Sequence, residues 1–212
     1  MKKSLLASLL LTLAVAGCSK DGEVSLTTDQ GYVDSQAAFD LSRNGYVCYQ
    51  LVTSMGNIDI AVDERLAPIS AANFKQYVDD EFYNGTIFHR VAKDFVVQGG
   101  GFTEDLTAKE VRSPIKNESY NGLRHYRGRV GMARGTGVDS ATSQFFINTK
   151  DNFNLDLSSN SAGYAVFGNV IAGMDVVDEM NNVEVGNQSN LTDVPTTAIT
   201  IDSLSVMDCP AQ

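Results

Sequence analysis

The chain has 212 residues, of which 43% are hydrophobic and 20% charged, proportions that suit one soluble globular domain with appended segments. Its formal net charge is −10. A chain this acidic argues against nucleic-acid binding, because that binding depends on Lys and Arg side chains that neutralise phosphates.

The first predicted element is an export signal. Two lysines form a positive n-region, and residues 5–16 form an apolar stretch that is too short to span a bilayer. The small residues before Cys18 resemble the lipobox of bacterial lipoproteins. This resemblance implies that residues 1–17 are a signal peptide and that the Cys18 thiol is lipidated. Ser19 favours the outer membrane, facing the periplasm. The alternative is an ordinary secretory signal followed by an incidental cysteine.

Residues 18–45 form a polar and acidic segment without a sustained apolar period. Such a segment has too little apolar surface to form a core of its own. We therefore predict a flexible tether with a short helix near residues 35–41, and we expect the folded domain to occupy residues 46–209.

Short strands are predicted for most of the remaining chain. Many short strands with only two helices favour a closed antiparallel barrel or a sandwich, and the spacing alone does not choose between them. Alternating apolar residues, turn signals and Pro68 at a first helical turn delimit the elements. They predict strands at 46–53, 56–62, 86–91, 95–98, 128–133, 144–148, 165–170 and 197–207, and helices at 68–82 and 174–181.

One group of basic residues is clustered in the sequence: Arg124, Arg127 and Arg129, with His125 between them. We interpret this group as a solvated loop, because charged side chains are mostly exposed. The chain has two histidines, His89 and His125, which make a poor metal-binding set. No metal or other cofactor is therefore expected.

Three ordered blocks of sequence carry a specific resemblance. The segment 88–103, FHRVAKDFVVQGGGFT, resembles the cyclophilin signature, and the segment 132–148, MARGTGVDSATSQFFIN, resembles the family's other signature. The third block is Leu155-Asp156 followed by GYAVFG at 163–168. The resemblance runs from about residue 46 to about residue 207 and is closest to bacterial, periplasmic-type members. It implies an eight-stranded antiparallel β-barrel closed by two α-helices, and peptidyl-prolyl cis/trans isomerase activity.

Isomerisation of an X–Pro bond needs no nucleophile, metal or cofactor, because no covalent bond is made or broken. The enzyme must bind the twisted amide more tightly than either planar form. In the twisted state the proline nitrogen becomes pyramidal, and a guanidinium can donate to its lone pair. Arg90 matches the family's catalytic arginine; the alternative is a surface arginine in a salt bridge. Gln98 matches a glutamine that hydrogen-bonds the substrate backbone and helps to position the arginine.

Further residues match the family's substrate-binding positions. The pocket for the proline ring corresponds to four apolar residues that would otherwise be interpreted as core. Tyr164 stands where eukaryotic members usually have His, and its ring and hydroxyl can serve as wall and donor. At Arg134 the family contact is mainly through the backbone, and His89 is expected to be a packed, supporting residue. The resemblance assigns Phe95, Met132, Phe146 and Leu155 to the pocket, and Ala133, Arg134 and Gln144 to the peptide groove.

Asn154 departs from the family pattern, because eukaryotic cyclophilins often carry Trp at this position and many bacterial members carry Phe. That Trp contributes a ring and an N–H to the binding of the drug cyclosporin. We therefore predict weak cyclosporin binding with isomerase activity retained.

The two remaining cysteines are Cys48 and Cys209. In the fold that the resemblance implies, the first and last strands are antiparallel neighbours, which would bring the two cysteines together. We predict a disulfide between them, since an exported protein meets oxidising conditions. The alternative is two separate reduced thiols.

The sequence therefore favours an active isomerase that assists the folding of exported proteins at the bacterial cell envelope. Its expected partners are proline-containing peptides, unfolded exported proteins and, through the lipid anchor, the membrane; family resemblance suggests a monomer. The alternatives are a proline-peptide-binding chaperone module with little turnover and, less favoured, a structural envelope lipoprotein. The intact set of matched residues favours the isomerase.

Overall fold

The computed structural model describes residues 45–210, so the predicted signal peptide, the predicted lipidation site at Cys18 and the predicted tether with its short helix lie outside the described residues. Within residues 45–210, neither helix is long and apolar enough to cross a membrane. The elements are β1 (Tyr46–Thr53), β2 (Gly56–Asp63), α1 (Pro68–Asp79), β3 (Thr86–Ile87), β4 (Arg90–Ala92), β5 (Val96–Gly99), β6 (Arg129–Met132), β7 (Phe145–Asn148), the 3₁₀ helix η1 (Phe153–Leu155), β8 (Val166–Ala172), α2 (Met174–Asn181), β9 (Val185–Gln188), β10 (Leu191–Pro195) and β11 (Thr200–Met207).

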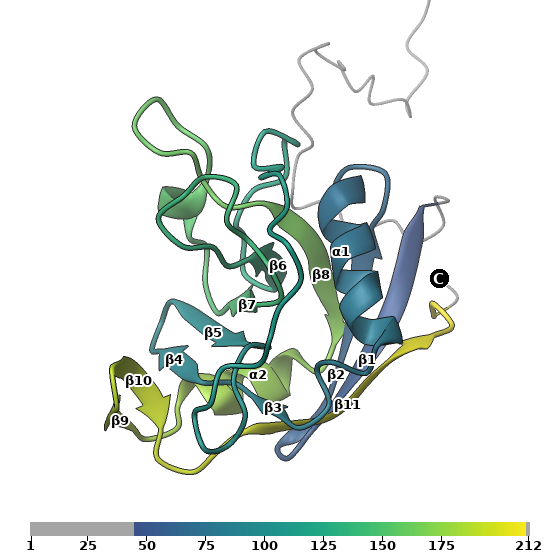
Figure 1. Cartoon of the computed structure of the whole chain (residues 1–212). Helices are drawn as coiled ribbons and strands as arrows, with labels where there is room; N and C mark the ends of the chain where they lie inside the picture. The colour runs from purple at the N-terminus through teal and green to yellow at the C-terminus, as the bar shows by residue number, and fades with distance from the viewer. Residues whose placement is uncertain (1–44, 211–212) are drawn as a thin grey trace, which may run out of the picture. The chain divides into compact units, whose positions relative to one another are not determined.

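One curled antiparallel sheet forms the body of the domain (Figure 1). Its strand order is β3-β11-β1-β2-β8-β6-β7-β5-β4. The two edge strands, β3 and β4, are consecutive in the chain and are separated only by Phe88 and His89. Counted as one interrupted strand, they give the eight-stranded antiparallel arrangement that the sequence predicted, and the mainly β fold with two helices is confirmed.

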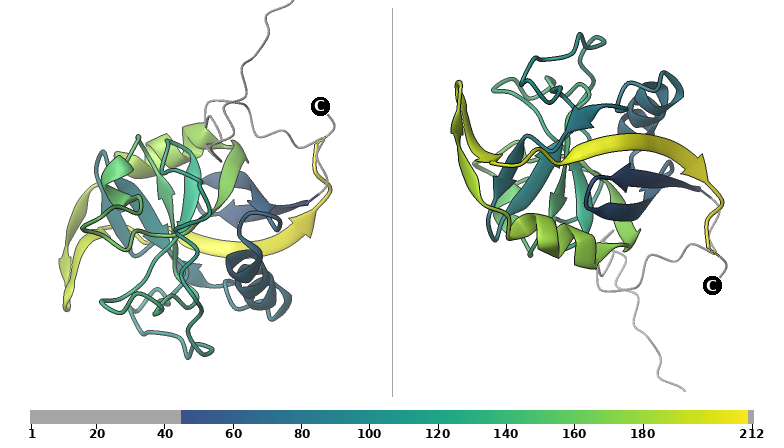
Figure 2. Two further views of the ribbon diagram at one scale, coloured as in Figure 1. Left: turned by 90° about the horizontal axis from the view of Figure 1, so that it is seen from above. Right: turned by 90° about the horizontal axis from the view of Figure 1, so that it is seen from below.

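The core fills the inside of this sheet and the inner face of both helices. The helices lie on opposite sides of the barrel (Figure 2), and each contributes buried apolar residues. From α1, the Phe74 ring is surrounded by four aromatic rings at centroid distances of 5.3 to 5.7 Å. Such tilted and edge-to-face pairs stabilise a core beyond the area that they bury. The four partners are Tyr49, Tyr83, Phe145 and Phe167.

The N–H groups in the first turn of α1 are hydrogen-bonded by a carboxylate that is distant in the sequence. Pro68 lies in the first turn, and the residue before the helix provides no side-chain cap. Instead the buried Glu118 carboxylate accepts hydrogen bonds from the Ile69 and Ser70 N–H groups, at 3.0 and 2.7 Å, and from the Ser70 hydroxyl. A negative group is favourable here, because the first N–H groups of a helix lack intrahelical partners and the helix dipole is positive at this end.

The helix α1 ends at Asp79, three residues before the predicted end. Glu81 adopts a left-handed conformation with φ 52°, and the Phe82 N–H donates to the Tyr77 carbonyl at 2.9 Å. This is a Schellman ending, in which the first apolar residue after the helix packs back on its last turn. The Phe82 ring lies 4.7 Å from the Tyr77 ring, so an apolar residue continues the helical pattern after the helix itself has ended.

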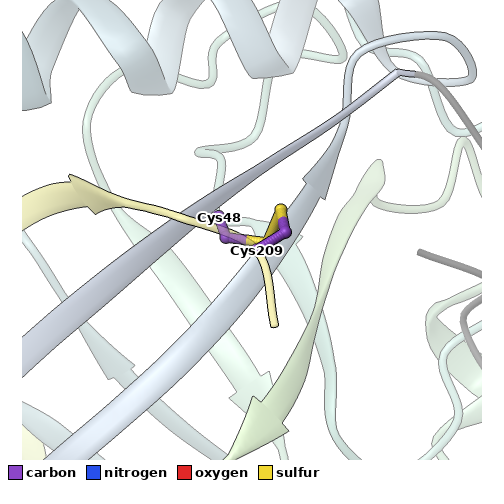
Figure 3. The surroundings of a disulfide bond; sticks show 2 residues. All are labelled: Cys48 and Cys209. Carbon is purple, nitrogen blue, oxygen red and sulfur yellow. A yellow bond between two sulfur atoms is a disulfide. The ribbon is translucent and has the colours of Figure 1, made fainter. Parts of the chain in front are cut away.

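The predicted disulfide is present between Cys48 and Cys209 (Figure 3). Strands β1 and β11 pair antiparallel, and Cys48 lies opposite Met207, two residues before Cys209. The two Cα atoms are 5.1 Å apart, which is within the range that a disulfide spans. The bond joins the two ends of the folded domain across a sequence separation of 161 residues.

The hairpin of β9 and β10 was not predicted from the sequence. Most of its side chains are exposed or half-buried, so its residues lack the apolar alternation that marks a strand. It forms a separate two-stranded sheet beside β4 (Figure 1). The last strand, β11, accordingly begins at Thr200 rather than at residue 197.

Candidate active site

A cavity of about 290 Å³ lies on one side of the barrel, over β4, β5 and β7. It collects eight of the ten residues that the sequence assigned to catalysis and substrate binding, together with Val96, which was not predicted. Met132 and Gln144 are the two that do not line it. The lining residues are Arg90, Phe95, Val96, Gln98, Ala133, Arg134, Phe146, Leu155 and Tyr164.

Three lining side chains come from one row across the sheet. Arg90 of β4 pairs with Gln98 of β5, and Gln98 pairs with Phe146 of β7. Directly opposed residues on neighbouring strands project from the same face of a sheet. The strand register therefore places a guanidinium, a carboxamide and an aromatic ring next to one another. The row continues at Gly131 of β6, where a Cβ would lie 2.5 Å from the Phe146 ring.

Gln144 does not line the cavity but contacts Gln98 of the row. Its Oε1 accepts a hydrogen bond from Gln98 Nε2 at 3.0 Å. Its side chain packs against Gly101, where a Cβ would lie 2.6 Å from Gln144 Cγ. This packing fixes Gln144, which in turn orients the Gln98 carboxamide.

The Arg90 side chain is about one-third exposed, and its Nε lies 3.5 Å from Asp193 Oδ2. Arg90 thus lines the cavity and also forms an ion pair. The two interpretations of Arg90 from the sequence, a residue of the active site and an arginine in a salt bridge, are therefore compatible. Asp193 lies in β10, within the hairpin that the sequence pattern did not reveal. No motif block includes Asp193, and nothing in its local sequence pointed to Arg90.

Met132 is absent from the lining of this cavity. Its side chain is buried in the core cluster, whereas Val96 lines the cavity. Strand periodicity could have found Val96, because residues two apart on a strand face the same side. Val96 and Gln98 are two apart on β5, and Gln98 was already assigned to the site.

Apart from Val96, the other lining residues lie outside the β-strands, in loops and in the 3₁₀ helix η1. The Tyr164 ring lies edge-on to the Phe146 ring at 5.9 Å. The Arg134 guanidinium lies 4.5 Å from the Tyr164 ring centre, and its Nε donates to the Gly163 carbonyl at 3.0 Å. The Arg134 side chain is therefore fixed at the cavity, although the resemblance suggested mainly a backbone contact there.

The interpretation of residues 124–129 as a solvated loop is wrong. His125 is fully buried, and its ring stacks on Phe146 with centroids 5.5 Å apart. Its Nε2 lies 3.0 Å from the Tyr164 carbonyl, and Asn148 Nδ2 lies 3.2 Å from its Nδ1. Burial lowers the pKa of His125, so the ring is neutral at physiological pH, with Nε2–H as donor and Nδ1 as acceptor.

The neighbouring arginines are anchored by carboxylates that are distant in the sequence. Arg124 Nε donates to Asp156 at 2.9 Å, and the Arg127 guanidinium forms two hydrogen bonds with Asp178, at 2.8 and 2.7 Å. Arg129 is 6% exposed, and burial lowers its pKa. The sequence could not show these pairs, because each arginine is about 30 to 50 residues from its acidic partner.

His89 is packed beside the site, as expected. Its ring is 4% exposed and lies 4.6 Å from the Phe102 ring. Burial, and then the adjacent Arg90 charge, lower the pKa of His89 to about 4. At neutral pH the His89 ring is therefore a neutral imidazole and cannot act as an imidazolium acid. Within residues 45–210, no group of three His, Cys, Asp or Glu side chains could hold a metal ion.

Residues 48–206 match the family model for cyclophilin type peptidyl-prolyl cis-trans isomerases. The chain belongs to this family. The cyclophilin is 50% identical over 157 residues to peptidyl-prolyl cis-trans isomerase A of Dickeya dadantii, covering 74% of this chain and 83% of the relative. It is 44% identical over 159 residues to peptidyl-prolyl cis-trans isomerase B of Escherichia coli, covering 74% of this chain and 97% of the relative.

A solved cyclophilin from Cryptosporidium parvum shows the same fold, with a TM-score of 0.67 and 24% identity. The superposition covers 78% of this chain and 99% of that chain. The family match and the two bacterial relatives make the protein a peptidyl-prolyl cis-trans isomerase, an enzyme of class EC 5.2.1.8.

The cavity of this cyclophilin combines a charged donor with an apolar wall. Apolar walls can take up a proline ring, and Arg90 and Gln98 can donate hydrogen bonds to a peptide held against them. Asn154 is exposed and does not line the cavity, whereas the adjacent Leu155 does. The Phe153 ring does not replace the missing Trp; it is exposed and lies beneath the Arg124 guanidinium at 3.9 Å.

Proposed function

We propose that this cyclophilin isomerises X–Pro bonds in exported polypeptides at the bacterial cell envelope, with Arg90 as its catalytic residue. The observation that carries the proposal is the row of Arg90, Gln98 and Phe146 on three adjacent strands, beside an apolar cavity. This arrangement supplies the two things that the reaction needs: a place for the proline ring and a donor beside its nitrogen.

The role of Arg90 follows from the barrier of the reaction. Rotation about the X–Pro bond must disrupt amide resonance, which costs about 18–20 kcal/mol. At the twisted geometry the nitrogen lone pair is no longer delocalised, so a guanidinium donor interacts with it only in the transition state. An interaction that exists only there lowers the barrier without tightening substrate binding. A guanidinium offers several N–H donors in a fixed planar fork, which suits it to this role.

The remaining lining residues would hold the substrate. The apolar side chains of Phe95, Val96, Phe146 and Leu155 would enclose the proline ring. Gln98 would hydrogen-bond the substrate backbone, while Ala133, Arg134 and Tyr164 border the groove along which the peptide runs. A Cryptosporidium parvum cyclophilin solved in the presence of the dipeptide Ala-Pro supports a proline-containing peptide as the ligand.

The proposed location at the envelope has two supports. Residues 1–18 have the composition of a lipoprotein signal with its lipidated Cys18. The disulfide between Cys48 and Cys209 is typical of an oxidising compartment. Several acyl chains on Cys18 would hold the enzyme at the membrane, because each buried methylene contributes about 0.8 kcal/mol.

A protease-coupled isomerisation assay on an Ala-Pro peptide tests the enzymatic assignment. We expect Arg90→Ala to lower kcat/KM at least about 10²-fold, the size of effect seen when one transition-state donor is removed. Arg127→Ala is the matched control, since Arg127 also forms an ion pair but does not line the cavity. An inactive wild type would favour the binding-module alternative, and equal activity of wild type and Arg90→Ala would refute the role of Arg90.

Membrane fractionation of cells that carry Cys18→Ser tests the location. We expect the wild type in the outer-membrane fraction and the variant in the soluble periplasmic fraction. If the wild type is found in the cytoplasm, or if the variant stays with the membrane, the proposed lipid anchor on Cys18 is wrong.

A further inference from the structure

The hairpin of β9 and β10 brings an acidic side chain to the edge of the active site. It forms its own two-stranded sheet and packs beside β4, the strand that carries Arg90 (Figure 1). Val194 and Pro195 anchor the second strand of the hairpin by their burial, whereas Asp193 is 41% exposed. The hairpin is thus fixed by one end of β10, and the residue next to that anchor reaches toward the site.

Local backbone geometry directs this residue. The pairing of β9 and β10 is irregular between Leu191 and Val194, and Asp193 within this irregularity has a left-handed conformation with φ 58°. Bulges in a strand pair change the direction of a side chain and often occur next to active sites. Asp and Asn tolerate the left-handed region better than other residues with a side chain. An aspartate therefore fits this position both in backbone conformation and in the charge that it presents.

The Asp193 carboxylate meets one particular side of the Arg90 guanidinium. Its Oδ2 lies 3.5 Å from Arg90 Nε. Across residues 45–210, Asp193 is the one carboxylate that forms an ion pair with Arg90. The cross-strand neighbour Gln98 is neutral, and its Nε2 is already engaged with Gln144. Attraction at the Nε side therefore limits how the guanidinium turns about its long and flexible side chain.

We propose that Asp193 is a positioning residue for Arg90: its carboxylate attracts the Nε side of the guanidinium, so that the two terminal amino groups face the proline site. The inference rests on the proposed role of Arg90. A guanidinium is planar with five N–H donors in a fixed fork, so holding one edge sets the direction of the others. Because both partners are partly exposed, the pair contributes little to folding stability and acts mainly on the orientation of Arg90.

The variant Asp193→Asn tests this role with little disturbance of the backbone, since Asn also tolerates a positive φ. We expect kcat/KM at low ionic strength to fall about three- to tenfold, mostly in kcat, with an unchanged unfolding midpoint. The matched control is Asp178→Asn. Asp178 pairs with Arg127 at a similar exposure, 46% against 41%, outside the cavity, and its loss should leave kcat/KM unchanged.

Two further readouts separate positioning from a merely structural role. Salt screens exposed charge pairs, so wild-type kcat should decline toward that of Asp193→Asn as salt rises from about 0.01 M to 1 M, while the variant stays flat. In an Arg90→Lys background, which lacks the Nε–H edge of the fork, Asp193→Asn should have no additional effect on kcat.

The outcomes for Asp193 and for Arg90 are distinguishable. If Arg90→Ala abolishes activity while Asp193→Asn matches or exceeds the wild type, the positioning role is refuted and the proposed function stands. The positioning role is also refuted if the effect of Asp193→Asn persists undiminished in Arg90→Lys. If Arg90→Ala retains full activity, the proposed catalytic role itself fails, whatever the result for Asp193.

Discussion

The two walls of the cavity are built by different means. On the strand wall, Arg90, Gln98 and Phe146 follow directly from the pairing of three adjacent strands. On the loop wall, Leu155 ends the short 3₁₀ helix η1 and Tyr164 lies in irregular chain, and polar contacts hold both segments. A regular ladder positions side chains through the same backbone hydrogen bonds that form the sheet, whereas a loop needs a dedicated partner for each buried polar group.

His125 is the centre of the contacts that hold the loop wall. Its N–H donates to Asp156 at 2.9 Å, its ring contacts the Tyr164 carbonyl, and its face supports Phe146 of the strand wall. Asp156 also pairs with Arg124, so a single carboxylate links two segments that are more than 30 residues apart. The side chains of the strand wall are therefore positioned by strand register, whereas those of the loop wall are positioned by contacts of a few buried polar groups.

The largest effect should come from opening the disulfide that joins the ends of the paired strands β1 and β11. We expect the double variant Cys48→Ser with Cys209→Ser to lose about 4–5 kcal/mol of unfolding free energy, because the bond restrains a very long loop in the unfolded chain. Urea denaturation with and without a reductant measures this loss. The reductant should destabilise the wild type and leave the variant unaffected; equal sensitivity of both would contradict the prediction.

Acid should lower the stability of the fold through His89, which is buried beside the strand wall. Its pKa in the folded state is about 4, below the value of about 6.5 in the unfolded chain, so between these values the unfolded state binds the extra proton. Stability is therefore full above about pH 6.5 and falls by roughly 3 kcal/mol as the pH drops to about 4. Thermal unfolding across this range gives the slope. His89→Phe should reduce the slope, and an unchanged slope would rule out His89 as its source.

His125→Leu should break the loop wall while the strand wall keeps its register. The substitution leaves the Tyr164 carbonyl without its buried donor, so we expect a loss of about 1–3 kcal/mol in unfolding free energy. Tyr164 and Phe146 should lose their alignment, which we expect to raise KM about three- to tenfold with a smaller change in kcat. Steady-state kinetics and denaturation measure both effects. A loss confined to kcat would instead place the role of His125 on the Arg90 side.

Asn154, which departs from the family pattern, lies next to Leu155 of the loop wall without lining the cavity. We predict weak cyclosporin inhibition of the wild type with full isomerase activity. Asn154→Trp should tighten inhibition about tenfold or more, since an indole contributes both ring surface and a donor. Inhibition curves in the isomerisation assay measure this, with turnover of both proteins as the control. Nanomolar inhibition of the wild type would overturn the prediction.

The sequence was informative where function lies in contiguous segments. Arg90, Phe95 and Gln98 fall within one motif of 16 residues, and Phe146 falls within another, so matching the motifs assigned them together. The pairing of Cys48 with Cys209 followed from the order of the first and last strands in the implied fold. Val96 was overlooked in favour of Met132, although the periodicity of β5 was sufficient to find it.

The residues that were missed have partners far away in the chain. Asp193 reaches Arg90 from a hairpin whose exposed strands lack apolar alternation. His125 looked solvated among three arginines, yet it is buried, because its ring stacks on Phe146 and its Nε2 lies against the Tyr164 carbonyl. The Glu118 carboxylate that satisfies the first turn of α1 is likewise 48 residues away from Ser70. Local pattern contains no information about which distant groups will meet.

By itself the sequence determined the strands and helices through their periods and the family resemblance through contiguous motifs, because both are written in neighbouring residues. That resemblance in turn implied the barrel, the disulfide and the residues of the strand wall. Only the tertiary structure decided the loop wall, the neutral buried state of His125 and the approach of Asp193 to Arg90. The physical reason is that these features are contacts between segments whose meeting depends on how the whole sheet curls and closes.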